Sequence, residues 1–213
     1  MYRRDFLTLG VKSIATGMMG LAAAEAFADG GCTMIGPGLQ RCDVGIPFTA
    51  ATQKAKQQHM SEWCWAASIS MAFAFHGYEV AQERIVAEAW GGIVNVPGSP
   101  EAILESVNRR WKADDGTLFS ASGTPYDVSI PTIVEDLKAN YPVLIGTMGH
   151  MMVLTHIAWI QNAYGAWQIV DATVRDPWPY NQSRRALSPA EWANTQIAVR
   201  LRTERDDSDD DDQ

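Results

Sequence analysis

The sequence predicts an α+β domain in which helices come first and antiparallel strands follow. Three features indicate this order: an apolar helix in the first third, further helical spacing after it, and a strand, turn and strand in the second half. With 213 residues, the chain is long enough for one well-packed domain and short for two. Its composition, 46% hydrophobic and 20% charged, is that of a globular protein. We therefore expect a single core, with a cleft between a helical half and a sheet half.

The first 28 residues are predicted to be an export signal. Arg3 and Arg4 precede a mildly apolar stretch at residues 7–24, and Ala28 ends a small-x-small sequence at which a signal peptidase can cut. The arginine pair resembles the twin-arginine signal, which directs folded proteins across the bacterial inner membrane. The alternative is an amphipathic helix that remains attached. We expect a periplasmic or secreted bacterial protein with no stable membrane anchor after cleavage.

Residues 29–52 are predicted to be an N-terminal extension of the domain. This segment is rich in Gly and Pro and shows neither a helical nor a strand period. It contains Cys32 and Cys42, which can close a ten-residue loop as a disulfide in an oxidising compartment. Cys64 is then left without a partner.

A helix is predicted from Ser61, as its cap, to Gly77, which ends it. Apolar residues lie almost all round this helix, so we expect it to run through the middle of the protein. Cys64 falls in its first turn, where unsatisfied backbone N–H groups and the helix dipole favour a nucleophilic thiolate. The alternative is that Cys64 is a small buried hydrophobic residue.

Other elements follow from spacing and caps. Helical spacing continues at residues 80–89 and then at 100–111, the second segment with Ser99 as its cap. Ser188 and Glu191 form a capping box for a brief helix. The remaining predicted elements are strands at about 141–148, 150–161, 166–176 and 195–201, and a helix at 131–139.

A nucleophilic cysteine needs an imidazole, and the candidates are His59, His76, His150 and His156. His59 is too close to Cys64 in sequence. His76 lies three turns further along the same helix, more than about 10 Å from Cys64. His150 and His156 remain, and both lie on the predicted strand at 150–161.

The predicted hairpin distinguishes these two histidines. Folding it about residue 163 places His150 opposite Asp176 and His156 opposite Val170. A carboxylate opposite the base would hold the imidazole in the tautomer that accepts a thiol proton. Asp171 is the rival orienting group, and a register shift of two or more residues would reopen the choice.

The segment from Gln58 to Ser68 resembles papain-like cysteine peptidases. Gln58 stands six residues before Cys64, which opens the helix as Cys64-Trp65-Ala66-Ala67-Ser68. In those enzymes a glutamine at this spacing donates to the oxyanion, so the resemblance implies that role for Gln58. Gln57 is the neighbouring alternative.

A second resemblance concerns the histidine. Pro142-Val143 followed by Gly149-His150 resembles the bacteriocin-leader-processing peptidases and secreted bacterial effector proteases with a papain-like fold, and Asp176-Pro177 matches their Asp-Pro. The resemblance covers residues 53–180. It implies a papain-like fold over residues 53–202, a catalytic set of Cys64, His150, Asp176 and Gln58, a peptide or protein substrate, and no metal or cofactor.

The charge distribution argues against nucleic acid as a partner. The formal net charge is −8, and Lys and Arg are nowhere clustered. Seven of the 25 acidic residues lie within 204–212, so residues 203–213 are predicted to be a disordered tail. Two alternatives to a peptidase stay open: an amidase or acyltransferase with the same triad, and a non-catalytic binding module.

Overall fold

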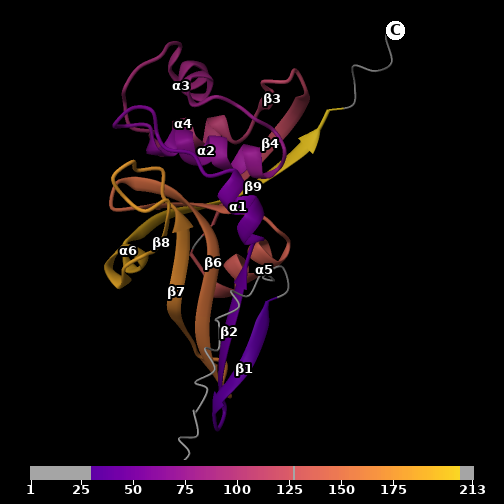
Figure 1. Cartoon of the computed structure of the whole chain (residues 1–213), viewed down its shortest axis with the longest axis vertical. Helices are drawn as coiled ribbons and strands as arrows, with labels where there is room; N and C mark the ends of the chain where they lie inside the picture. Colours follow the sequence, from indigo (N-terminus) through magenta and orange to yellow (C-terminus); the bar gives the residue numbers. More distant parts are fainter. Residues whose placement is uncertain (1–29, 127, 207–213) are drawn as a thin grey trace, which may run out of the picture.

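The computed structural model describes residues 30–126 and 128–206, which form one antiparallel sheet with helices packed on it (Figure 1). The predicted α+β class is confirmed. The predicted export signal lies outside the described residues. The strands are β1 (Gly31–Gly36), β2 (Leu39–Gly45), β3 (Arg110–Lys112), β4 (Leu118–Tyr126), β5 (Val143–Thr147), β6 (His150–Asn162), β7 (Trp167–Arg175), β8 (Arg184–Ala186) and β9 (Thr195–Arg205). The helices are α1 (Phe48–Gln53), α2 (Cys64–Phe75), α3 (Gln82–Trp90), α4 (Pro100–Ser106), α5 (Ile130–Lys138) and α6 (Pro189–Ala193).

The long strand β6 organises the sheet. The strand order is β1-β2-β6-β5-β9-β4-β3, and β7 pairs with β6 and β8. β5 pairs with the first part of β6 and β2 with the last part, so these two strands lie end to end along one side of β6, opposite β7. In Figure 1, β1, β2, β6 and β7 extend as a long ribbon away from α2, α3 and α4.

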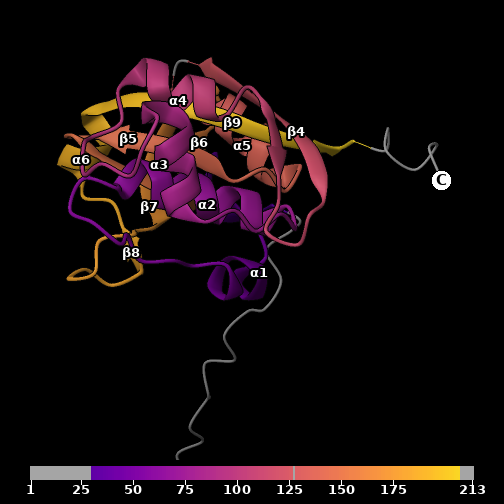
Figure 2. The ribbon, with the colours of Figure 1, turned by 90° about the horizontal axis from the view of Figure 1, so that it is seen from above.

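Both faces of the sheet are buried at β5. On β5, Leu144 belongs to a hydrophobic cluster with residues of α2, whereas its neighbours Val143 and Ile145 belong to a second cluster with Ile133 and Leu137 of α5. Because successive side chains of a strand point to opposite faces, this alternation places α2 and α5 on opposite sides of the sheet. Figure 2 shows α2, α3 and α4 next to one another.

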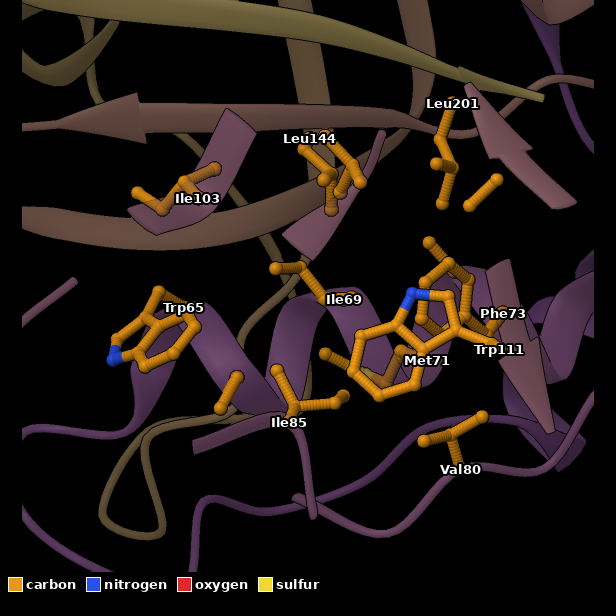
Figure 3. Close-up of a cluster of buried hydrophobic side chains, with 14 of the residues drawn as sticks. Trp65, Ile69, Met71, Phe73, Val80, Ile85, Ile103, Trp111, Leu144 and Leu201 are labelled. Atoms are coloured by element: carbon orange, nitrogen blue, oxygen red, sulfur yellow. The ribbon is translucent and has the colours of Figure 1, made fainter. Parts of the chain in front are cut away.

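Helix α2 is the centre of the first cluster. Ten of its twelve residues are buried, as its apolar sequence predicts. Ile69 and Phe73 pack between strand residues such as Leu144 on one side and Ile85 of α3 on the other (Figure 3). The helix ends where predicted, since Gly77 follows its C-cap with a φ of 93°. Because α2 is buried, the position of Cys64 at its N-terminus is fixed.

The segment 29–52, predicted to be an N-terminal extension, contains two strands that its sequence pattern did not reveal. β1 and β2 make a hairpin that joins the sheet through β6, and a disulfide links the directly opposed Cys32 and Cys42. All but the last residue of β1 are exposed, so this edge strand carries no alternating hydrophobic pattern that would have revealed it. α1 follows within the same segment.

Two further boundaries differ from the prediction. The helix predicted to reach residue 111 ends at Ser106. Trp111 lies in β3 and is buried there; the prediction included it because its position in the sequence fits the helical spacing of apolar residues. At the C-terminus, β9 continues to Arg205, and Asp206 forms an ion pair with Arg110, so residues 203–206 are part of the fold. The rest of the predicted tail lies outside the described residues.

Within the described ranges, no helix has the length and apolar character needed to cross a membrane.

Candidate active site

Cys64 is the first residue of α2. Trp63 is the N-cap residue, and no side chain there caps the helix. The predicted cap was wrong: Ser61 lies outside the helix and its hydroxyl accepts a hydrogen bond from the Asn95 amide. The N–H groups of the first turn therefore have no side-chain acceptor at the N-cap, and they form the positive end of the helix dipole beside Cys64.

The indoles of Trp63 and Trp65 fix the loop beside Cys64. Nε1 of Trp63 donates to the carbonyl of Val94 over 2.8 Å, and Nε1 of Trp65 donates to the carbonyl of Val96 over 3.3 Å. Both tryptophans are buried. The loop that carries Val94 and Val96 is thus attached to the residues on either side of the thiol.

His150 is positioned by a tight turn. It opens β6 opposite Thr147, the last residue of β5, and the two residues between them, Met148 and Gly149, have φ values of 50° and 80°. Two successive positive φ values are typical of the turn that closes a two-residue hairpin. The geometry of the β5–β6 turn therefore determines where the imidazole lies.

Asp176 lies just beyond the end of β7, and its side chain is fully buried. Its Oδ1 accepts a hydrogen bond from Nε2 of His150 at 2.7 Å and from the backbone N–H of Trp178 at 2.9 Å. Its Oδ2 accepts from Asn181 at 2.8 Å and from Nε of Arg185 at 2.6 Å. Burial raises the pKa of the carboxyl, but these donors outweigh it and hold the pKa of Asp176 well below its ordinary value.

The imidazole of His150 is stabilised in its charged form. Burial lowers its pKa, but hydrogen bonds and charge interactions with Asp176 and Cys64 outweigh this effect and raise the pKa of His150 to about 9. Because Nε2 faces Asp176, Nδ1 is the ring nitrogen that remains for the thiol. The ring also meets the edge of Trp178, with 6.4 Å between centroids. At neutral pH this site can hold an imidazolium beside a sulfur nucleophile.

Cys64 and His150 line the same cleft, which has a volume of about 420 Å³. The rest of the lining is largely apolar, with Trp65, Leu104 and Ile197 among its residues. One wall includes Gly98, where a Cβ would lie 2.5 to 2.9 Å from the ring of Trp65. A side chain at position 98 would therefore collide with the indole next to Cys64.

Gln58 is buried, but its amide nitrogen is already occupied. Nε2 donates to the carbonyls of Met60 at 2.9 Å and Ser61 at 2.7 Å, and Gln58 is not among the residues that line the cleft. Its backbone N–H donates to the carbonyl of Pro177, which brings this segment beside Asp176. A role at the oxyanion stays a prediction, and it requires one of these carbonyl contacts to be exchanged. The carbonyl of Gln57, the alternative, accepts from Gln82.

The predicted hairpin register was wrong by two residues, because the midpoint of the turn lies at residue 164 and not at 163. Val153 therefore lies opposite Arg175, and a register irregularity between Leu154 and His156 places His156 opposite Thr173. His156 lies between carboxylates: its Nδ1 is 3.4 Å from Asp171, and its Nε2 is 3.9 Å from Asp43. Asp171 is thus a neighbour of His156 and not of His150. Of the other histidines, His59 pairs with Glu83 on the surface.

Arg185 and Asn181 contact Asp176, but sequence reasoning missed both. They lie in a polar segment whose sequence shows no strand or helix period, so nothing indicated which residues turn inward. The one available signal was the capping box of α6, since its Glu191 forms the ion pair that holds Arg185.

A family model described as the Peptidase_C39 like family matches residues 46–197 of the chain. The match spans α2, β6 and β7, so it includes Cys64, His150 and Asp176. A search of curated proteins finds no match.

Proposed function

The chain belongs to the Peptidase_C39 like family, a papain-like cysteine peptidase family, and from this premise we propose that it hydrolyses peptide bonds with Cys64 as nucleophile, His150 as base and Asp176 as the group that orients His150. The observation that carries the proposal is the meeting of Cys64 and His150 in one cleft, with Nε2 of His150 on Asp176. Helix N-terminus, imidazole and buried carboxylate together form the arrangement that activates a sulfur nucleophile.

In the proposed mechanism the sulfur of Cys64 attacks the carbonyl carbon of the scissile peptide bond. The imidazolium of His150 then donates its Nδ1 proton to the departing amine, leaving an acyl group on sulfur. His150, now neutral, takes a proton from water as the water attacks the thioester. The carboxylic acid leaves, and the Cys64 thiolate and the His150 imidazolium are restored. Asp176 keeps the ring in the orientation that presents Nδ1 throughout.

The developing oxyanion is proposed to bind at the N-terminus of α2. The backbone N–H of Cys64 is a donor in the first turn of a helix without a side-chain cap, and it is close to the reacting sulfur by covalent connection. Gln58 is the second proposed donor. Because its Nε2 binds the carbonyls of Met60 and Ser61, we propose that substrate binding exchanges one of these contacts for the oxyanion.

A peptide or protein outside the cytoplasm is the proposed substrate. The largely apolar lining of the cleft suits peptide side chains more than a charged small molecule. The Cys32–Cys42 disulfide supports the proposed export, since such bonds persist in oxidising compartments. Closer kinship with leader-processing or effector proteases rests on the sequence resemblance described above.

Active-site labelling tests this proposal. The purified full chain is expected to react with a thiol-directed epoxide and to cleave members of a peptide library, and Cys64→Ala is expected to lose both while retaining its circular dichroism spectrum. The matched control, Ser68→Ala, changes a buried hydroxyl on the same helix that bonds to the carbonyl of Met151. Equal turnover by Cys64→Ala and the unaltered chain would refute the assignment.

A further inference from the structure

The carboxylate of Asp176 is held from two sides. His150 and the Trp178 N–H bind Oδ1, and Asn181 and Arg185 bind Oδ2. The shortest of these four contacts is the 2.6 Å bond from Nε of Arg185. With two donors on each oxygen, the carboxylate cannot rotate away from His150 without breaking a contact on the far side.

Arg185 is itself held by helix α6. Its Nη2 lies 2.7 Å from Oε1 of Glu191 and its Nη1 lies 3.1 Å from Oε2, a bidentate pairing that fixes the plane of the guanidinium. Glu191 belongs to the capping box of α6, where Oε2 also accepts the N–H of Ser188. The carbonyl of Glu191 accepts a hydrogen bond from Thr147, the residue opposite His150, over 2.5 Å. α6 is therefore linked through Thr147 to the start of β6 at His150, and through Arg185 to Asp176.

Charges alternate along this chain of contacts. His150 is followed by Asp176, then by Arg185, then by Glu191, so a protonated His150 makes the set neutral overall. The charged groups acting on His150 are Asp176 and Cys64, those on Asp176 are His150 and Arg185, and those on Arg185 are Asp176 and Glu191. Without Glu191, the charge of Arg185 would offset that of Asp176 and leave only Cys64 to balance the imidazolium.

We propose that Arg185 is a positioning residue of the active site, which fixes the Asp176 carboxylate against His150, and that Glu191 orients Arg185 and balances its charge. Neither residue lines the cleft, so both act through Asp176. The inference rests on the proposed function, because it concerns the group that orients the base. It adds α6, a short helix on the far side of the carboxylate, to the parts of the fold on which the chemistry depends.

The first test compares two substitutions of Arg185 in the full chain. Arg185→Met removes both charge and hydrogen bond, and kcat is expected to fall about tenfold or more with KM nearly unchanged. Arg185→Lys keeps a charged donor for Oδ2 and is expected to recover part of the loss. The inference is overturned if kcat of Arg185→Met stays within about twofold of the unaltered chain, or if Lys performs no better than Met.

The second test removes only a charge and does not depend on turnover. Glu191→Gln retains the acceptor of the capping box, and it is expected to lower the pKa of His150, followed by NMR of the imidazole, by about half a unit or more. The control Ser188→Ala breaks the cap without changing charge and is expected to leave that pKa in place. An unmoved pKa in Glu191→Gln, or an equal shift in both variants, overturns the inference. Because the titration needs no substrate, its result is distinguishable from a failure of the peptidase proposal.

Discussion

Nε2 of His150 lies 2.7 Å from Oδ1 of Asp176, although Asp176 falls outside the ladder that joins β6 and β7. The last paired residue of β7 is Arg175, which lies opposite Val153 and not opposite His150. The contact therefore depends on the chain leaving the strand at Asp176, whose N–H donates to the carbonyl of Ser183. The geometry of this strand end, and not the sheet register alone, brings carboxylate and imidazole together.

Asp176→Asn is expected to lower the pKa of His150 from about 9 toward or below 6.5, because burial remains while the balancing charge is lost. The alkaline limb of kcat should move to lower pH, and kcat should fall by at least about tenfold. Both are measured in a pH–rate profile. Asp171→Asn is the matched control, since Asp171 lies beside His156. A change in that variant equal to the change in Asp176→Asn would favour the rival orienting group.

His150 is also expected to make stability depend on pH. Its folded pKa is raised above the ordinary 6.5 to about 9, so its contribution is fully present below pH 6.5 and is lost as the pH rises through about 9. The free energy of unfolding, measured by urea titration, should fall by about 1 to 3 kcal/mol between pH 6.5 and about pH 9. Burial lowers the pKa of His76 and His156, so these residues gain their charge below this pH range. The decrease should be smaller in His150→Gln, and an equal decrease there would contradict the assignment.

Gly98→Ala is expected to damage the active site without touching a catalytic group. The added Cβ would meet the ring of Trp65, which is fully buried and cannot move aside, so the wall of the cleft must shift. We expect a loss of about 1 to 3 kcal/mol in stability and slower epoxide labelling of Cys64. Gly92→Ala is the control, because a Cβ at Gly92 meets nothing within 4 Å. Equal behaviour of the two variants would show that the wall is not rigid.

Removing the Cys32–Cys42 disulfide is expected to destabilise the fold but to spare the chemistry. A loop of this length predicts a loss of about 2 to 3 kcal/mol in the free energy of unfolding for the double variant Cys32→Ser, Cys42→Ala. The bond lies in the β1–β2 hairpin, whose residues do not line the cleft, so the rate of epoxide labelling at Cys64 should be unchanged. Urea titration and labelling of the same sample measure both quantities. An unchanged midpoint would show that the disulfide contributes nothing to stability.

The sequence predicted the elements whose signals are local. The apolar helix with Cys64 at its start and the capping box at Ser188 were both recognisable, because caps and periodicity depend on neighbouring residues. The pairing of His150 with Asp176 was also anticipated, although by a register that the structure corrects. The two-residue error in register did not separate them, since Asp176 lies beyond the strand and its position is not set by the ladder.

What the sequence could not predict depends on distant contacts. β1 carries no alternation, and it becomes a strand because β2 lies beside it. Arg185 looks like any surface arginine until the fold places the Asp176 carboxylate at its Nε and the Glu191 carboxylate at its Nη atoms. Ion pairs of this kind have no period in the sequence, so only the tertiary structure reveals them.

If the chain acts as the proposed peptidase, we expect the two indole hydrogen bonds at the start of α2 to affect how it discriminates between substrates. A bulky residue that presses on the wall at Pro97 and Gly98 displaces a loop whose carbonyls hold Trp63 and Trp65, and these flank the sulfur in the chain. Poorly fitting peptides are therefore expected to bind but to react slowly, because the Cys64 sulfur is displaced from its position for attack on the carbonyl carbon. Selectivity would appear in turnover more than in affinity.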